Sequence, residues 1–297
     1  MPMGKCVVFC YIGVWYENIR KKENIVNTNS ENSDIGMKFT VLGARGSVPT
    51  GGEGYNKYGG NTSCYMVECG DEQIFLDAGT GMIKAPYYMD KRITILLSHL
   101  HIDHLIGFPF FTPLFDKGRR VAIYSAIREN GLLKDQLNGL FRPPFWPLRI
   151  DDYIADIDYL VPEFPFMIGD IKVDGIEGNH PGGSTIYKLT RNGRSIVFMT
   201  DFEHSPEGFD SELIEFAKGA DILLYDGQYT EEEYETHKGF GHSTPEKGME
   251  FMNLTGAKNM YFIHHDPAHD DAVLDELEGK YGKGNIHYAR YGDVIVL

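Results

Sequence analysis

The sequence is poor in cysteine, and its few cysteines form no pattern. Only four occur among 297 residues, at Cys6, Cys10, Cys64 and Cys69, and no two of them make a Cys-x-x-Cys pair. This usage argues against a disulfide framework and is typical of a reducing compartment. We therefore expect a cytoplasmic protein.

The sequence also lacks an apolar run that would cross a bilayer. The stretch CVVFCYIGVWY at 6–16 is much shorter than the roughly 20 residues that a membrane-spanning helix needs. It follows a single Lys and has no A-x-A-like cleavage site, which argues against a signal peptide. The segment that follows is polar and rich in Asn and Ser, as linkers are. We expect 1–36 to be an N-terminal appendage with a polar linker, 37–297 to be the working domain, and no membrane partner.

Positive charge is scarce. The chain has 28 Lys and Arg against 43 Asp and Glu, a net charge of −15, and no basic cluster exceeds the RKK at 20–22. A protein that grips many phosphates needs the opposite sign. Large nucleic acids are therefore disfavoured as partners, although a local basic patch and a homodimer both stay open.

From Met37 onward the apolar pattern alternates between strands and helices. The tight GDE turn between two strands at 63–70 and 73–79 predicts a hairpin, and FRPPFWP at 141–147 predicts a loop. Two strand-rich halves with helices outside indicate a sandwich of sheets flanked by helices. Strands are predicted at 38–43, 63–70, 73–79, 93–98, 121–126, 171–179, 184–190, 195–200, 221–227 and 259–265, and helices at 131–141, 210–218, 244–256 and 270–282.

One short stretch, SHLHIDHLIG at 98–107, holds three of the chain's 11 histidines and one aspartate. It follows an apolar strand and is predicted to run into a helix. His99 and His101, two positions apart in extended chain, project to one side, whereas Asp103 and His104 come after the turn. This arrangement suits two neighbouring metal ions, and its ligand types favour Zn²⁺, with Mn²⁺ or Fe as alternatives. A surface or helix-capping cluster is the competing interpretation.

A two-metal site needs further ligands from other strand ends. His180, Asp201 and His264 each close a predicted strand. A lone histidine of this kind is more often structural, but as a set these residues complete the motif. Asp201 is the natural bridge, because a carboxylate can offer one oxygen to each ion.

With Asp77 in FLDAGTG, these motifs resemble the five signature positions of the metallo-β-lactamase superfamily of metal-dependent hydrolases, over about residues 37–297. The resemblance implies an α/β fold, a four-layer αββα sandwich with a binuclear site at one edge of its sheets. It makes Asp77 a residue that orients a ligand. It also implies that one metal takes His99, His101 and His180, that the other takes Asp103, His104 and His264, and that Asp201 is shared.

Departures from other branches point to the phosphodiesterase branch, which includes tRNase Z and the cyclic phosphate phosphodiesterase of the carbon–phosphorus lyase pathway. True β-lactamases usually carry Cys at the position of Asp201, and the flavin-linked di-iron branch has an acid at that of His101. Glyoxalase II-like thioesterases tend to read Pro-Gly-His-Thr at the third signature, which His180-Pro-Gly-Gly does not match. The segments that resemble the phosphodiesterase branch are GARGSVPT…YGGNTSCYMVE (43–68), GFGHSTPEKG (239–248) and HHDPAHDD (264–271).

Within that branch the sequence favours a small substrate. Only 20 residues separate His180 from Asp201, where tRNase Z normally carries its long tRNA-gripping arm. We expect hydrolysis of a small or cyclic phosphodiester through a hydroxide that bridges the two metals, with Asp103 steering the water and His242 serving the leaving oxygen. The alternatives are a helix-capping role for His242, a tRNA 3′-end endonuclease, and a non-catalytic metal-binding sensor on the same fold.

The remaining candidates surround this site. His204 and His265 each adjoin a ligand in sequence, so we expect them next to the ligands or at the rim of the site. Asn61 and Ser63 in the first hairpin, and Tyr229 in DGQYTEEEY, are candidates for substrate contacts.

Overall fold

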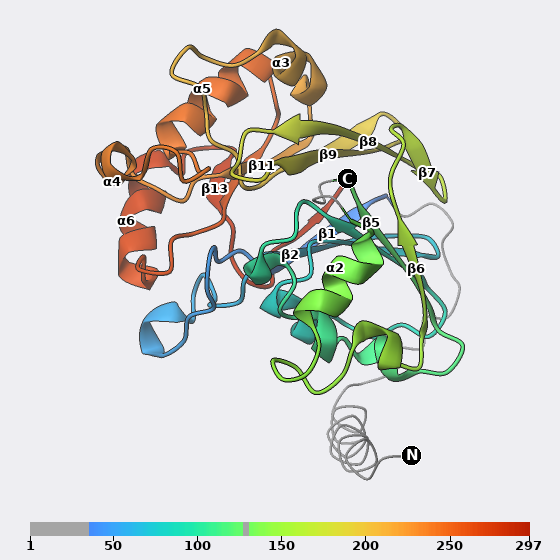
Figure 1. Ribbon diagram of the computed structural model, residues 1–297. Helices are drawn as coiled ribbons and strands as arrows, with labels where there is room; N and C mark the ends of the chain where they lie inside the picture. Colours follow the sequence, from blue (N-terminus) through green and yellow to red (C-terminus); the bar gives the residue numbers. More distant parts are fainter. Residues whose placement is uncertain (1–35, 127–130) are drawn as a thin grey trace.

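The computed structural model describes residues 36–126 and 131–297. Two seven-stranded sheets lie face to face in it, with helices on both outer sides (Figure 1). The N-terminal appendage predicted at 1–36 lies outside the described residues except for Gly36. None of the described helices is both long and apolar enough to cross a membrane.

The first sheet has the strand order β14-β1-β2-β3-β4-β5-β6. Its first strands are antiparallel, and the predicted hairpin of β2 and β3 is confirmed by the pairing of Cys69 with Glu72. From β3 to β6 the strands run parallel. The bounds are β1 Lys38–Gly43, β2 Cys64–Cys69, β3 Glu72–Leu76, β4 Arg92–Leu97, β5 Arg120–Ser125, β6 Asp156–Leu160 and β14 Val294–Val296.

The second sheet has the order β13-β12-β11-β10-β9-β8-β7 and the same mixed character. Strands β7 to β10 are antiparallel, and β10 to β13 are parallel. The bounds are β7 Phe166–Ile168, β8 Ile171–Gly178, β9 Ser184–Arg191, β10 Arg194–Met199, β11 Ile222–Asp226, β12 Met260–Ile263 and β13 Ile286–Tyr288.

Helix α2 covers the outer side of the first sheet, and α3, α5 and α6 pack on the outer side of the second (Figure 1). Three apolar clusters fill the three spaces between the four layers. On β10, Ile196 and Phe198 face the other sheet whereas Val197 and Met199 face the helices, as the period of two requires. The predicted αββα sandwich is confirmed. The helix bounds are α2 Leu133–Leu140, α3 Ser211–Ala217, α4 Glu231–His237, α5 Pro245–Thr255 and α6 Asp271–Tyr281.

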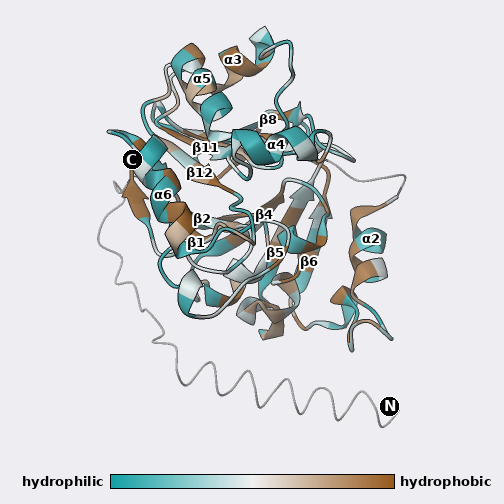
Figure 2. Ribbon diagram, turned by 90° about the vertical axis from the view of Figure 1, so that its left-hand side faces the viewer, coloured by the Kyte–Doolittle hydropathy of each residue, from teal (hydrophilic) through white to brown (hydrophobic). Residues whose placement is uncertain are grey.

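Two details differ from the sequence-based expectation. The segment after β4 is not one helix but a series of 3-10 turns at Ile102–His104, Phe108–Phe110 and Thr112–Phe115, because prolines recur in it and break helical hydrogen bonding. The prediction also omitted β6, β7, β13, β14 and α4. These strands are short or lie at sheet edges, and α4 is almost wholly hydrophilic, so neither carries a strong apolar period (Figure 2).

A buried carboxylate ties the start of β11 to its neighbours. Asp221 accepts hydrogen bonds from Arg194 Nη1 and Lys258 Nζ, both at 2.7 Å, and from Ser195 N at 2.9 Å. Burial alone would raise the pKa of Asp221, but these donors outweigh it and lower the pKa below its usual value. The ionised form therefore stabilises the fold.

Replacing Asp221 by Asn is expected to lower the free energy of unfolding at pH 7 by about 1–2 kcal/mol, because both cationic partners are more than half exposed and partly screened. Since the folded-state pKa lies below the unfolded one, this stabilisation is present above about pH 4 and disappears as the pH falls further. Urea unfolding at pH 7 and pH 3 should show that the free energies of unfolding of the wild type and of Asp221→Asn differ less at pH 3. Asp158→Asn, which breaks an exposed pair with Arg120, is the matched control and should cost less. An equal loss of unfolding free energy in Asp221→Asn and Asp158→Asn would contradict the stabilising role of ionised Asp221.

Candidate metal centre

The polar residues singled out in the sequence meet where strands of both sheets end. The chain leaves β4 into His99, β8 into His180, β10 into Asp201 and β12 into His264. Since β10, β11 and β12 are parallel neighbours, their carboxyl ends share one edge of the second sheet. These four ligand candidates are thus held at strand ends, whereas His101, Asp103 and His104 lie in the loop and 3-10 turn that follow β4.

Two groups of ligand atoms form there. In each group the atoms lie within 4.8 Å of one another, and Asp201 also forms a group with His264 and His242. Of the first group only His101 is exposed, so the centre opens to solvent on its side. The first group is His99, His101, His180 and Asp201, and the second is Asp103, His104 and His264.

Asp201 lies between the two groups. Its Oδ2 is 3.2 Å from His104 Nε2, while its Oδ1 is 3.5 Å from His264 Nε2 and 3.7 Å from His180 Nε2. The carboxylate thus presents one oxygen or the other to rings of both groups. This is the position that the sequence predicted for a bridging ligand.

The backbone is strained around this centre. Five described residues other than glycine have positive φ, and four of them belong to the site: Ser47, Asp77, Asp201 and His264, at 51° to 61°. Such conformations cost on the order of 1–3 kcal/mol each and persist only where the surroundings enforce them. The close grouping of polar side chains is therefore maintained against a local cost.

Four of the five candidate ligand histidines are oriented through Nδ1, whereas His101 turns its own Nδ1 towards His180 Nε2, which lies 3.2 Å away. His104 Nδ1 lies 2.6 Å from Asp77 Oδ2, His180 Nδ1 lies 2.9 Å from the carbonyl oxygen of Gly241, and His264 Nδ1 lies 2.8 Å from Gln228 Oε1. These contacts leave the Nε2 atoms for the centre of the cluster. Asp77, which also accepts from the Ser98 amide at 2.7 Å, occupies the orienting position implied by the resemblance.

The residues fit divalent cations. The Nε2 atoms of His99 and His104 are buried and make no well-aligned hydrogen bond, although His104 Nε2 faces carboxylate oxygens of Asp103 and Asp201, each at 3.2 Å. Buried polar atoms are rarely left without a partner, and each exception needs an explanation. A cation held by imidazole and carboxylate groups would satisfy both atoms at once.

The electrostatics agree with this fit. Burial lowers the pKa of His99 well below its usual value and also lowers the pKa values of His101 and His180, so these rings are neutral. Burial acts in the same direction on His104 and His264, but neighbouring carboxylates, Asp201 among them, outweigh it and raise both pKa values. Protons on these two rings balance the acidic charge. Divalent cations would displace such protons, since a ligand ring must be neutral.

His242 lies beside the second group without being one of its predicted ligands. Its ring is stacked on that of His264 at 4.7 Å, and its Nδ1 lies 2.8 Å from Asp226 Oδ2. Asp226 is fully buried and also accepts from the Asp201 amide at 3.0 Å. The sequence analysis missed Asp226, although it ends the predicted strand DILLYDG as Asp201 ends its own.

Other missed residues hold the loop that carries His242. Glu203 Oε2 accepts from the Gly241 amide at 2.8 Å, and Glu203 Oε1 accepts from the Tyr234 hydroxyl at 2.9 Å. Gln228, which orients His264, follows Asp226 by two positions. None of these side chains belongs to a recognisable motif, because each acts through a partner distant in sequence.

The two histidines expected next to the ligands support the surrounding frame. His204 Nδ1 lies 2.8 Å from Ser243 Oγ, next to His242 in sequence. His265 packs against Tyr58 and Tyr288, and burial lowers its pKa to about 3. His204 therefore supports the loop of His242, and His265 the strand ends.

The predicted substrate contacts occupy different depths. Ser63 is fully buried, with its hydroxyl 3.4 Å from Asp77 Oδ2, and the Asn61 carbonyl accepts from the Arg45 amide at 3.0 Å. Tyr229 is largely buried, and the centroid of its ring lies 5.7 Å from that of His242 in an edge-to-face contact. Of the three, Tyr229 lies beside the proposed proton donor, and Asn61 is partly open to solvent.

Comparisons with known proteins agree with this geometry. A family model described as the beta-lactamase superfamily domain matches residues 72–265, so the chain belongs to that superfamily. Fold, ligand cluster and family together define a metal-dependent hydrolase. The Ribonuclease Z of Haloarcula marismortui is 22% identical, with 82% of this chain and 92% of that protein covered.

Two solved structures share the fold. The metallo-beta-lactamase fold protein YhfI from Bacillus subtilis is 18% identical with a TM-score of 0.67, covering 89% of this chain and all of that one. A diphosphatase from the PhnP family is also 18% identical, with a TM-score of 0.65 and coverages of 87% and 97%.

Replacing Asp201 by Ala should remove at least one of two bound ions and nearly all activity, because both ligand groups lose a shared carboxylate. Elemental analysis of the purified proteins measures the first effect directly. Asp174→Ala, at a surface pair with Lys172 on β8, is the control and should keep both ions. Full metal occupancy in Asp201→Ala would show that the bridging assignment is wrong.

Proposed function

We propose that this protein is a cytoplasmic phosphodiesterase that hydrolyses a small or cyclic phosphodiester with two divalent metal ions, Zn²⁺ foremost and Mn²⁺ or Fe as alternatives. The observation that carries the proposal is His242, whose Nδ1 is engaged by buried Asp226 next to the ligand cluster. Its Nε2 is thereby left for a proton. A phosphodiester releases an alkoxide, which needs that proton.

The ligand assignment follows the two groups described above, with Asp201 shared between them. When bound, the cations would lower the pKa of a water molecule and neutralise the phosphoryl oxygens. We assign the remaining functions to two side chains, Asp103 and His242.

Asp103 serves as an acceptor that orients the attacking water. Its Oδ2 accepts from the Ser47 amide at 2.9 Å and lies 3.3 Å from His264 Nε2. Burial would raise the pKa of Asp103, but His104 and His264 hold it far below its usual range. A carboxylate that stays ionised can accept a hydrogen bond from water but is a poor final base.

His242 serves the leaving oxygen. Asp226 fixes the orientation of the ring through Nδ1, at 2.8 Å from its Oδ2. Tyr229 and His264 pack on the ring from two directions, at 5.7 and 4.7 Å between centroids. The ring therefore has one orientation in which to deliver its proton.

The preference for a small substrate rests on the second sheet and on charge. Between His180 and Asp201 the chain forms only β9 and β10, joined by the two-residue turn Asn192–Gly193. Both residues have positive φ, as a tight hairpin turn of this kind requires. The segment where tRNase Z carries its arm is therefore a closed hairpin, and the net charge of −15 gives no general attraction to RNA.

A tRNA 3′-end endonuclease is the second candidate. The specific observation in its favour is the likeness to Ribonuclease Z proteins, which extends over most of both chains.

A hydrolysis panel separates the candidates. The purified protein, loaded with Zn²⁺ or Mn²⁺, is offered bis(p-nitrophenyl) phosphate, cyclic nucleotides, cyclic ribose phosphates and a precursor tRNA. We expect turnover of the small diesters and little or no cleavage of the tRNA. Preferred cleavage of the tRNA at its 3′ end would select the second candidate, and no turnover of any diester with both metals bound would favour a non-catalytic sensor.

The role of His242 predicts a leaving-group dependence. His242→Ala should keep its metal and lose kcat by roughly 10²–10⁴ on a cyclic ribose phosphate, the usual range for general acid catalysis. Bis(p-nitrophenyl) phosphate should lose much less, because p-nitrophenolate departs readily without a proton.

His287→Ala on β13, where the ring packs against Tyr261, is the control and should leave both rates unchanged. Equal losses on the two substrates in His242→Ala, with metal content intact, would remove His242 from proton transfer. Loss of metal would make it a ligand instead.

A further inference from the structure

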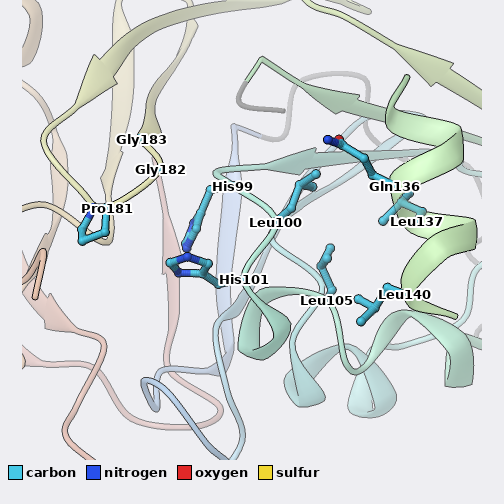
Figure 3. Close-up of a pocket in the computed structure, with 10 residues that line it drawn as sticks. All are labelled: His99, Leu100, His101, Leu105, Gln136, Leu137, Leu140, Pro181, Gly182 and Gly183. Atoms are coloured by element: carbon cyan, nitrogen blue, oxygen red, sulfur yellow. The ribbon is translucent and has the colours of Figure 1, made fainter. Parts of the chain in front are cut away.

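A cavity of about 300 Å³ lies directly beside the first ligand group. It is bounded by the loop after β4, by helix α2 and by the turn after His180. Figure 3 shows leucines of the loop and of α2 on one side, Pro181 on the other, and His99 and His101 between them. A group bound here would touch the metal centre.

The lining of the cavity is apolar and uncharged. Its side chains are Leu100, Leu105, Leu137, Leu140 and Pro181, and none of its lining residues is Asp, Glu, Lys or Arg. Its polar members besides the two histidines are the side chain of Gln136 and the peptide groups of Gly182 and Gly183. An ionic group buried here would lack a partner of opposite charge, which is costly.

These features discriminate between classes of substituent. A following nucleotide or second phosphate needs cations, and Lys134 on the same helix is paired with Asp151 at 3.1 Å. A nucleobase needs aromatic stacking and several hydrogen bonds, whereas the lining has branched aliphatic groups and one side-chain amide. An alkyl chain needs only apolar surface.

The volume sets the size of the chain. A dry protein cavity of roughly 150 Å³ holds benzene, so about 300 Å³ accepts a group of about eight to twelve carbon atoms. The cavity also reaches the lower end of the range of small-ligand pockets, about 300–1,000 Å³.

We propose that this cavity is a specificity pocket for an alkyl chain, so that the substrate is a phosphodiester with one aliphatic ester group. The inference rests on the proposed phosphodiesterase function, which it narrows. The phosphoryl group lies at the ligand cluster, and the alkyl ester lies along Leu100, Leu137 and Leu140. The other ester oxygen is the leaving oxygen that His242 serves.

A homologous series of substrates tests the pocket. Methyl, butyl and octyl p-nitrophenyl phosphates share a leaving group and differ only in the chain. Burial of each methylene is expected to raise kcat/KM about threefold to fourfold until the cavity is full. Rates that do not depend on chain length overturn the inference, and so does a faster reaction of the thymidine 5′-p-nitrophenyl ester, which would indicate a nucleobase pocket.

A matched pair of variants locates the effect. Leu140→Arg introduces a charge into the lining and should abolish the preference for the octyl over the methyl ester. Leu132→Arg, at the start of the same helix and 68% exposed, lies outside the lining and should preserve the preference. If both variants keep the preference for the octyl ester, or both lose it, the alkyl chain does not bind in this cavity.

A binding measurement keeps this inference distinct from the proposed function. In calorimetry with the wild-type protein, octyl phosphate should bind at least tenfold more tightly than butyl phosphate, whether or not the esters are hydrolysed. If no ester is hydrolysed but octyl phosphate still binds more tightly, the phosphodiesterase proposal is rejected and the apolar pocket is kept. Equal affinities reject the pocket.

Discussion

The mutual compensation of buried charges around Asp201 is the constraint on which the rest of the structure depends. A fully buried carboxylate is stable only with partners, and here the charged partners are His104 and His264, brought from the two sheets. The Asp201 amide is in turn held by Asp226. Each strand at this edge must therefore end where the residue that follows it can place its side chain in the cluster. At Asp201 and His264 this requires a strained backbone with positive φ.

The stacking of the two sheets sets the spacing of the ligand groups. The His99–His104 motif belongs to the first sheet, whereas His180, Asp201 and His264 belong to the second. Apart from apolar packing, two hydrogen bonds tie the sheets together just before the motif: the Tyr187 hydroxyl donates to the Leu97 carbonyl at 2.9 Å, and the Thr185 amide donates to the Ser98 carbonyl at 2.8 Å. The inter-sheet core thus acts as the scaffold of the metal centre.

The metal centre has polar groups on one side and an apolar cavity on the other. On the side of the second sheet, Asp226 and Glu203 fix the loop that carries His242. On the other side, the leucines of α2 bound a cavity without charge. In the proposed reaction the phosphoryl group lies between His242 and the apolar cavity, and the short β9–β10 hairpin adds no surface for a large nucleic acid. These features support the compact diester that we propose as the substrate.

The place of the candidate ligand cluster could be predicted from sequence because its members follow apolar strands, either directly or within the short His99–His104 motif, and strand period and strand ends are local properties. The same rule predicted the sheets and most helices, but it missed edge strands and α4, whose apolar pattern is weak. Only the tertiary structure revealed Asp226 and Glu203, because their partners lie 16 and 38 residues away. The cavity beside His101 was hidden for the same reason: α2, the loop after β4 and the turn at Pro181 are separate in the chain, and packing alone brings them together.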